Sequence, residues 1–363
     1  MPGYARFHKS LIAWFNDNRQ SLPWRENRTP YRVWVSEIML QQTQIATVIP
    51  YFDRFMRHFP DVQTLAAAPL DDVLKLWEGL GYYSRARNMH RAAKKIVEEF
   101  RGEFPSTAKD WMRLPGIGRY TAGAVASLAF GEDAPLLDGN VIRVLTRWHN
   151  LDDDITQTST KQMLWTLAGD MLPRGHAGQW NEAIMELGQR ICLPKNPTCE
   201  SCPVAKLCAA RATNRQHTLP VRPRRKSLPH REVAAGIIIR EDKQILITKR
   251  YADAMLGGLW EFPGGKREPD ETLPECVVRE IREELAIDVE VGYQLAVVRH
   301  AYTHFKMTLY AFVCRHVSGV PQALGCAEWR WTPIDQLDQY AFPRADHSII
   351  EALKDGAQTG FAW

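Results

Sequence analysis

One 17-residue window contains four of the seven cysteines, Cys192, Cys199, Cys202 and Cys208, with the spacing C-x6-C-x2-C-x5-C. Four thiolates held this close together can surround a soft metal centre, either an iron–sulfur cluster or zinc. Zinc sites usually show two short cysteine pairs separated by a longer arm, whereas this window has one short pair. Four unrelated buried cysteines are disfavoured in so tight a cluster. The window therefore predicts a metal centre.

The cysteines also bear on the cellular compartment. Residues 1–9 lack the apolar core of a signal peptide, and the chain has no run of about 20 apolar residues that could span a membrane. We therefore expect a reducing compartment, the cytoplasm, where cysteines serve as metal ligands or buried thiols before they form disulfides.

Charge is distributed unevenly along the chain. Residues 1–230 hold 31 Lys and Arg against 22 Asp and Glu, whereas residues 231–363 hold 15 against 20. The basic first part suits a polyanionic partner such as DNA, and the acidic second part does not share that property.

The pattern of apolar residues divides the chain into two domains. Residues 1–211 show helical periodicity interrupted by breakers, residues 212–231 form a basic, proline-containing linker without acids, and residues 232–363 show the alternation of strands around one helix. We expect an all-α domain followed by an α+β domain. The expected helices are 30–40, 45–58, 70–78, 84–100, 119–130, 139–148, 159–171, 179–191 and 272–285, and the expected strands are 233–239, 244–248, 289–299 and 305–315.

A glycine-rich turn joins two of the expected helices at Leu114-Pro115-Gly116-Ile117-Gly118. Glycines permit tight backbone geometry and leave amide N–H groups uncovered at the start of the next helix, where a phosphate can bind. The alternative is an ordinary connection between helices. Asp138 follows this turn by 20 residues and precedes another expected helix, so it is either a helix N-cap or a functional carboxylate, and the two roles are compatible.

Glu37 lies in an apolar stretch with Val33, Trp34, Ile38 and Leu40. Such neighbours disfavour the charged carboxylate and raise its pKa, which suits a general acid at neutral pH. The alternative is a surface glutamate on an amphipathic helix.

Several segments resemble the MutY-type adenine DNA glycosylases of the helix-hairpin-helix superfamily. They are the cysteine window, the turn with the following Asp138, and the segments Leu22-Pro23-Trp24-Arg25, Leu40-Gln41-Gln42-Thr43-Gln44 and Gly79-Leu80-Gly81-Tyr82-Tyr83. The resemblance covers nearly all of residues 4–211. It implies a [4Fe-4S] cluster on the four cysteines and double-stranded DNA as the partner.

The resemblance also implies roles for single residues. Glu37 is the expected proton donor to adenine, Asp138 stabilises the positive sugar, and Asn140 and Tyr120 fix the geometry. Tyr120 stands where the bifunctional endonuclease III branch has a Schiff-base lysine, so we expect cleavage of the glycosidic bond alone. The expected DNA-contacting residues are Trp24, Arg25, Leu40, Gln41, Gln42, Thr43, Tyr82, Gly116 and Gly118, with Gln42 and Tyr82 as wedges in the opened base stack.

The second domain contains a sequence that resembles the Nudix box, G-x5-E-x7-R-E-U-x-E-E-x-G-U with U aliphatic. The matching residues are Gly265, Glu271, Arg279, Glu280, Glu283 and Glu284, and Ala286 replaces the last glycine. On a helix, Glu280, Glu283 and Glu284 share one face, which suits Mg²⁺ if the box is active. The segment His300–Phe305 resembles the MutY loop that reads 8-oxoguanine, which makes Tyr302, Thr303 and His304 the expected lesion contacts.

From these observations we expect a multidomain, monomeric protein: an all-α helix-hairpin-helix glycosylase domain with a [4Fe-4S] loop, and an α+β Nudix-like domain. The expected activity is removal of adenine mispaired with 8-oxoguanine or guanine in base excision repair, by a cytoplasmic, nucleoid-associated bacterial enzyme. The main alternative is a dual-function protein that also hydrolyses nucleotide pyrophosphates. A bifunctional lyase and a non-catalytic lesion-binding protein are further alternatives.

Overall fold

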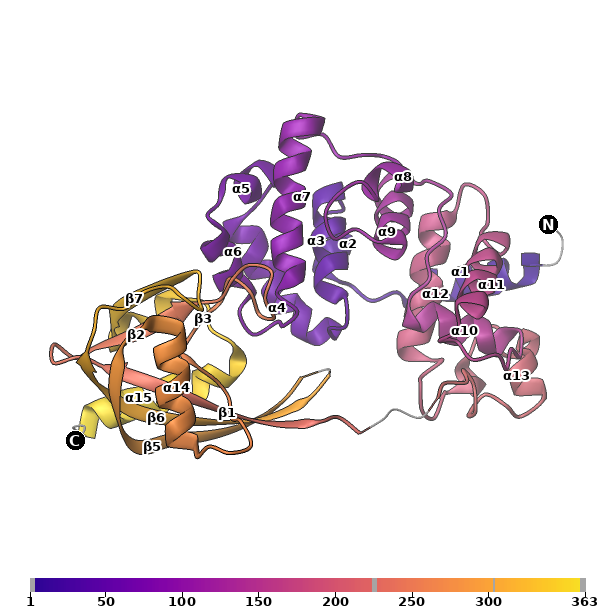
Figure 1. Cartoon of the computed structure of the whole chain (residues 1–363). Helices are drawn as coiled ribbons and strands as arrows, with labels where there is room; N and C mark the ends of the chain where they lie inside the picture. The colour runs from indigo at the N-terminus through magenta and orange to yellow at the C-terminus, as the bar shows by residue number, and fades with distance from the viewer. Residues whose placement is uncertain (1–3, 224–226, 303, 360–363) are drawn as a thin grey trace. The chain divides into compact units, whose positions relative to one another are not determined.

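The computed structural model describes residues 4–223, 227–302 and 304–359. The chain forms two compact units, one of Met1–Ala67 with Asn88–Arg225 and one of Ala68–Arg87 with Lys226–Trp363 (Figure 1). Residues 224–226 of the expected basic linker lie outside the described residues. Among the described residues, no helix is long and apolar enough to cross a membrane.

The first unit is helical, as the sequence predicts. The helices expected at 30–40, 45–58, 84–100, 119–130 and 139–148 are confirmed with these bounds, and those at 70–78, 159–171 and 179–191 to within two residues. The expectation missed the 14-residue helix Ala5–Asn18, and it missed short helices because three to six residues carry too little periodicity. The helices are α1 (Ala5–Asn18), α2 (Pro23–Glu26), α3 (Pro30–Leu40), α4 (Ile45–His58), α5 (Val62–Ala67), α6 (Leu70–Trp77), α7 (Ser84–Phe100), α8 (Ala108–Trp111), α9 (Arg119–Phe130), α10 (Gly139–Trp148), α11 (Thr158–Asp170), α12 (Ala177–Arg190), η2 (Cys199–Ser201), η3 (Ala205–Leu207) and α13 (Ala209–Ala212).

Helix α9 is the central element of the first unit. Its residues Thr121–Leu128 are all buried, and it packs against α3, α8 and α12. The backbones at these contacts lie close together because glycines occupy them. A Cβ atom on Gly123 would lie 2.3 Å from the carbonyl oxygen of Pro135, and one on Gly178 of α12 would lie 2.6 Å from the carbonyl oxygen of Ser127. The distance between packed helices depends on the side chains at their contact. Gly123 therefore lets α9 approach the backbone at Pro135, and Gly178 lets α12 approach α9.

The second unit contains a seven-stranded mixed sheet. Five of its strands follow one another in the order β3-β2-β1-β6-β5, while β4 pairs with β1 and β7 pairs with β2. Strands β1 and β6 are parallel, and the other pairs are antiparallel. The strands are β1 (His230–Ile239), β2 (Gln244–Lys249), β3 (Trp260–Glu261), β4 (Gly264–Lys266), β5 (Asp288–Ala301), β6 (Lys306–Ser318) and β7 (Glu328–Pro333). Strand β1 begins at His230, so it includes the last two residues of the expected linker.

Helices cover both faces of this sheet (Figure 1). Helix α14 (Leu273–Leu285) packs on one face with Ile238, and α15 (Arg344–Thr359), preceded by η4 (Ile334–Gln339), packs on the other with Ile237 and Ile239. Side chains alternate between the faces of a strand, which explains the apolar run in β1. Two-sided burial confirms the expected α+β fold.

Ala286 ends α14 in the left-handed conformation, with φ of 53°. This is the position where the Nudix pattern has glycine, which adopts that conformation without steric cost. The substitution therefore keeps the helix end that the pattern requires.

Candidate functional site

A cleft of about 840 Å³ in the first unit brings together many of the residues singled out from the sequence. These are Trp24, Arg25, Glu37, Leu40, Thr43, Tyr120, Asp138 and Asn140. They come from α2, α3, α9 and α10 and from the turns beside them. Residues up to 116 positions apart in the chain therefore line one cavity.

Glu37 lies on the cleft side of α3 and is 5% exposed. The hydroxyl of Tyr120 donates a hydrogen bond of 2.7 Å to its carboxylate. Burial raises the pKa of Glu37 to about 7, although the hydrogen bond from Tyr120 acts in the opposite direction. The carboxyl group therefore holds a proton near neutral pH, as the apolar neighbours predict.

Asp138 is the N-cap of α10 and a cleft residue at once. Its Oδ1 accepts a hydrogen bond of 2.7 Å from the backbone N–H of Val141, and its Oδ2 accepts one of 2.7 Å from the amide of Asn140. Burial raises the pKa of Asp138, and these hydrogen bonds oppose that change. The carboxylate is thus fixed in direction by two donors.

Arg143 continues this hydrogen-bonded chain away from the cleft. It donates to Asn140 Oδ1 at 2.8 Å, to the carbonyl oxygen of Gly188 at 2.6 Å and to that of Cys192 at 2.6 Å. The orientation of the Asn140 amide is therefore tied to the end of α12.

A group of ion pairs, which sequence analysis missed apart from Arg25, forms another part of the cleft. Arg25 contacts Glu182 at 3.0 Å and Glu186 at 2.7 Å, and Arg28 contacts Glu182 at 2.7 Å. Both acids are buried on α12, and buried charges are tolerated when they are paired. Their spacing of four residues on one helix was the available signal, but it does not identify partners about 150 positions away.

Other predicted contacts lie apart from the cleft lining. Gln41 donates to Thr121 Oγ1 at 3.0 Å. Gln42 is exposed, and its backbone has the left-handed conformation, with φ of 57°. Tyr82 belongs to the second unit, has φ of 50° and is 42% exposed. Gln41 and Gln42 are absent from the described lining of the cleft.

The glycine turn lies between α8 and α9. Gly116 has φ of 74°, and a Cβ atom there would lie 2.5 Å from Cβ of Asn88. Gly118 is the N-cap of α9 with open space around it. Gly116 is therefore needed for backbone reasons, whereas the extended conformation at Gly118 would accept a side chain, and its lack of one leaves the helix start uncovered.

The four clustered cysteines line one small cavity next to Arg147 and Trp148. Arg147, which is 1% exposed, donates to the sulfur of Cys192 at 3.3 Å and to the carbonyl oxygens of Leu193 and Leu219. Burial raises the pKa of the Cys202 thiol to about 12. Within the described residues, no group of three or more His, Cys, Asp and Glu side chains is placed to hold a metal ion. The four thiols nevertheless border one common cavity.

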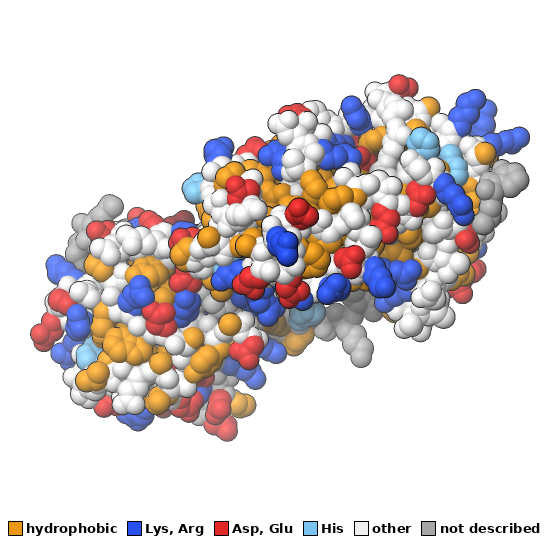
Figure 2. All heavy atoms as spheres, turned by 90° about the horizontal axis from the view of Figure 1, so that it is seen from above, with side chains coloured by type: hydrophobic (Ala, Val, Ile, Leu, Met, Phe, Trp, Pro, Cys, Tyr) orange, Lys and Arg blue, Asp and Glu red, His pale blue; other side chains and the backbone are white. Residues whose placement is uncertain are grey.

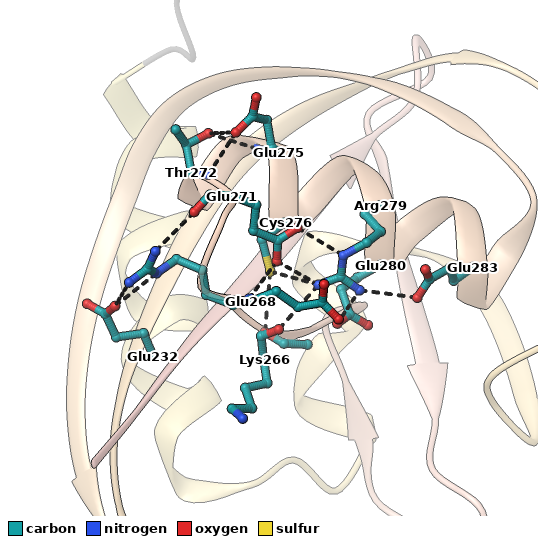
Figure 3. Close-up of polar contacts among 12 residues, drawn as sticks. Glu232, Lys266, Glu268, Glu271, Thr272, Glu275, Cys276, Arg279, Glu280 and Glu283 are labelled. Atoms are coloured by element: carbon teal, nitrogen blue, oxygen red, sulfur yellow. Dashed lines mark hydrogen bonds and ion pairs between the residues drawn. The ribbon is translucent and has the colours of Figure 1, made fainter.

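The Nudix-box residues form a hydrogen-bonded group centred on Arg279 (Figure 3). Arg279 contacts Glu271 at 2.7 Å, Glu280 at 2.9 Å and Glu283 at 3.2 Å. A Cβ atom on Gly265 would lie 2.2 Å from the carboxyl carbon of Glu280, so a side chain there would displace the Glu280 carboxylate from its present position.

Glu284 is the last of the four acids of the box. Burial raises the pKa of Glu284 to about 8, and the charge of Glu261 adds to this effect. Its carboxylate is 3.4 Å from the backbone N–H of Gly264.

The segment that resembles the lesion-reading loop is the tip between β5 and β6. The Tyr302 ring is half-buried and lies 5.0 Å from the Phe305 ring, whereas His304 is exposed. Thr303 lies outside the described residues.

The surface of the molecule carries both signs of charge. On the face drawn in Figure 2, Lys and Arg side chains are interleaved with Asp and Glu rather than gathered in one patch. The excess of basic residues in 1–230 is therefore spread out on that face.

Comparison with known proteins places these features in a family. A family model described as HhH-GPD superfamily base excision DNA repair protein matches residues 35–169, and a NUDIX domain model matches residues 234–352. The chain is 37% identical over 409 residues to the adenine DNA glycosylase of Homo sapiens, which covers 98% of this chain and 75% of that protein.

Two further similarities concern a bacterial protein and a solved structure. The adenine DNA glycosylase of Buchnera aphidicola subsp. Schizaphis graminum (strain Sg) is 40% identical over 258 residues, with 71% of this chain and 74% of that protein covered. The structure of a thermostable thymine-DNA glycosylase matches with a TM-score of 0.52 and 29% identity, covering 57% of this chain and 95% of that one.

Replacing the buried acid in Glu37→Gln should change how stability depends on pH. The pKa of Glu37 is raised from 4.5 to about 7 in the folded state, so the folded protein holds this proton more tightly than the unfolded chain. The resulting stability is present below about pH 4.5 and is lost as the pH rises through about 7. As the pH rises from about 5 to about 8, the unfolding free energy of wild type should therefore fall by about 2–3 kcal/mol relative to that of the variant.

Thermal unfolding of both proteins across this range measures the effect. Glu98→Gln, which removes an exposed carboxylate from α7, is the control for loss of charge. A constant difference between Glu37→Gln and wild type at all pH values would contradict the buried-acid assignment.

Proposed function

The chain belongs to the adenine DNA glycosylase family and is a DNA glycosylase of base excision repair, and from this we propose that it excises adenine mispaired with 8-oxoguanine or guanine in duplex DNA. The observation that carries the proposal is the shared cleft of Glu37 and Asp138. One is a buried acid with a raised pKa, and the other is a carboxylate held by two hydrogen bonds. Two carboxyl groups with different environments are what cleavage of a glycosidic bond requires.

In this proposal, Glu37 protonates the adenine at N7. Adenine leaves poorly as an anion, so the proton lets it depart as a neutral base. The hydrogen bond from Tyr120 orients the carboxyl group. Since the reaction uses the protonated form, base release should decline as the pH rises above about 7.

Asp138 stabilises the positive charge that develops on the sugar when the base departs. The hydrogen bonds from Val141 and Asn140 keep the carboxylate in one orientation, so little reorganisation is needed during the reaction. Tyr120 has no amine to attack the sugar, so water adds to C1′ of the sugar cation and loses a proton, and the reaction ends with free adenine and an abasic site.

DNA is engaged around this cleft. The adenine must leave the base stack to reach buried carboxyl groups, at a cost of a few kcal/mol. We assign Gln42 and Tyr82 to the opened stack, Gln41 and Thr43 to the orphan base, and Trp24, Arg25 and Leu40 to the adenine pocket. The N–H groups after Gly116 and Gly118 bind phosphate.

The second domain reads the lesion in this proposal. Its tip between β5 and β6 offers the exposed His304 next to the half-buried ring of Tyr302, and we assign these residues, with Thr303, to 8-oxoguanine. The domains 1–211 and 232–363, joined by the linker 212–231, act together on DNA as a cytoplasmic, nucleoid-associated monomer.

Single-turnover base release tests the proposed reaction. Duplexes carry adenine opposite 8-oxoguanine, guanine or thymine, and wild type is compared with Glu37→Gln and Asp138→Asn. We expect release opposite 8-oxoguanine and guanine but little opposite thymine, and a loss of about 100- to 10,000-fold in each variant. Glu98→Gln serves as the control. Unimpaired release by either cleft variant would refute the assignment, and a product trapped by borohydride would indicate a lyase instead.

We also propose that Cys192, Cys199, Cys202 and Cys208 hold a [4Fe-4S] cluster. The cavity that all four thiols line supports this, because a cluster of this kind is held by four cysteine thiolates. When bound, the cluster would cross-link the loop between α12 and α13 and supply no catalytic step.

Metal and sulfide assays of the purified protein test the cluster. We expect about four iron and four inorganic sulfide per chain, and Cys202→Ala should lose most of both. Cys314→Ala, which changes a buried cysteine of β6, is the matched control. One zinc per chain without sulfide would overturn the proposal.

A second candidate activity is hydrolysis of nucleotide pyrophosphates by the Nudix box. The ion pairs of Arg279 and the fit of Gly265 under Glu280 support it. An active box should release pyrophosphate or phosphate from nucleoside triphosphates with Mg²⁺, and Glu283→Gln should abolish that release. If wild type releases neither product, the box has no hydrolytic role, and lesion recognition is the sole function of the domain.

A further inference from the structure

The segment Ala68–Arg87 folds with the second unit although it lies early in the chain. It contains α6 and the turn Gly79–Tyr83. Gly79, Gly81 and Tyr82 have φ values of 87°, 75° and 50°. The left-handed conformation is unfavourable for a residue with a side chain, such as Tyr82, so the surrounding structure must hold it.

Glu78, directly before this turn, is the centre of the contacts that hold it. Its side chain is 13% exposed. Oε1 accepts a hydrogen bond of 2.8 Å from the backbone N–H of Phe342 and lies 3.2 Å from Nε2 of His347. Oε2 accepts from Lys75 Nζ at 2.5 Å. Glu78 thus joins residues 342–347 to the start of the turn.

Two more contacts connect the same parts of the chain. Lys75 Nζ also donates to the carbonyl oxygen of Tyr340 at 2.9 Å. The hydroxyl of Tyr83 donates to the carbonyl oxygen of Phe342 at 3.5 Å and accepts from the N–H of Gly79 at 3.1 Å. Both ends of the turn are therefore attached to the segment that enters α15.

The other side of that segment faces the β5–β6 tip. Helix α15 packs against β5, the strand that ends next to Tyr302. Burial and the charge of Asp346 raise the pKa of Tyr302 to about 12, and burial and the charge of Arg344 lower the pKa of His300. Residues 344–347 therefore interact both with the tip and with Glu78.

We propose that Glu78 is a positioning residue that links the β5–β6 tip, through the start of α15, to the turn that carries Tyr82. The second domain thereby sets the geometry of a residue assigned to the opened base stack. This inference rests on the proposed function, because it gives lesion recognition at Tyr302–His304 a physical route to the DNA wedge. Glu78 does not touch the substrate and acts through Tyr82.

Hydrogen exchange of the amides of residues 79–83 tests the link directly. Glu78→Ala and His347→Ala should each speed this exchange by about tenfold, within the range of measured couplings. Glu78→Gln keeps the volume and an acceptor for the Phe342 N–H but loses the negative charge, so it should have a smaller effect. Asp338→Ala, which removes the exposed ion pair with Lys354, is the control.

Single-turnover release provides the functional readout. The preference of the enzyme for adenine opposite 8-oxoguanine over guanine should fall by about tenfold in Glu78→Ala. It should fall less in Glu78→Gln and stay unchanged in Asp338→Ala. If Glu78→Ala does not fold, Glu78→Gln and His347→Ala carry both measurements.

The outcomes separate the two levels of inference. A wild type without preference for 8-oxoguanine would refute the proposed lesion reading, while the exchange measurement would still decide the link. Exchange at 79–83 that is unchanged in His347→Ala and the Glu78 variants would overturn the link. Faster exchange with an intact lesion preference would overturn its role in recognition.

Discussion

The close packing of α9 is the constraint on which the first unit depends. Gly123 and Gly178 allow backbone contacts that any side chain would block. Because α9 starts at the glycine turn and packs against α3 and α12, the distance between these helices determines where Glu37 and Tyr120 meet. A wider spacing would break the hydrogen bond between them. The geometry of the cleft therefore depends on interhelical distance, which small residues set.

The cleft concentrates acidic groups in a way that costs stability. Burial raises the pKa of Glu37, although the hydrogen bond from Tyr120 and the charge of Arg25 act in the opposite direction. Glu182 and Glu186 are buried with Arg25 as a shared partner. The fold therefore treats its acids differently: two are neutralised by arginine, while one holds a proton. That difference is what allows a single cavity to contain a proton donor near neutral pH.

The second unit is a sheet domain that contains both the Nudix-box residues and the β5–β6 tip. Arg279 forms ion pairs with three carboxylates of the box. The start of α15 connects the β5–β6 tip to the turn that contains Tyr82. Contacts of this domain thus reach a segment that the sequence assigns to the helical domain. The domain border along the chain and the compact units in space are different divisions.

The sequence by itself determined what depends on local spacing: most helices, the alternating strands, the glycine turn, the cysteine window and the apolar surroundings of Glu37. These follow from periodicities and short-range geometry that any stretch of chain displays. Only the tertiary structure decided the pairing of Arg25 with Glu182, the contact of Arg147 with Cys192, and the attachment of Glu78 to Phe342. Such partners lie 45 to 264 positions apart. The residues next to a charged group or an amide in the sequence do not indicate which distant group will pair with it.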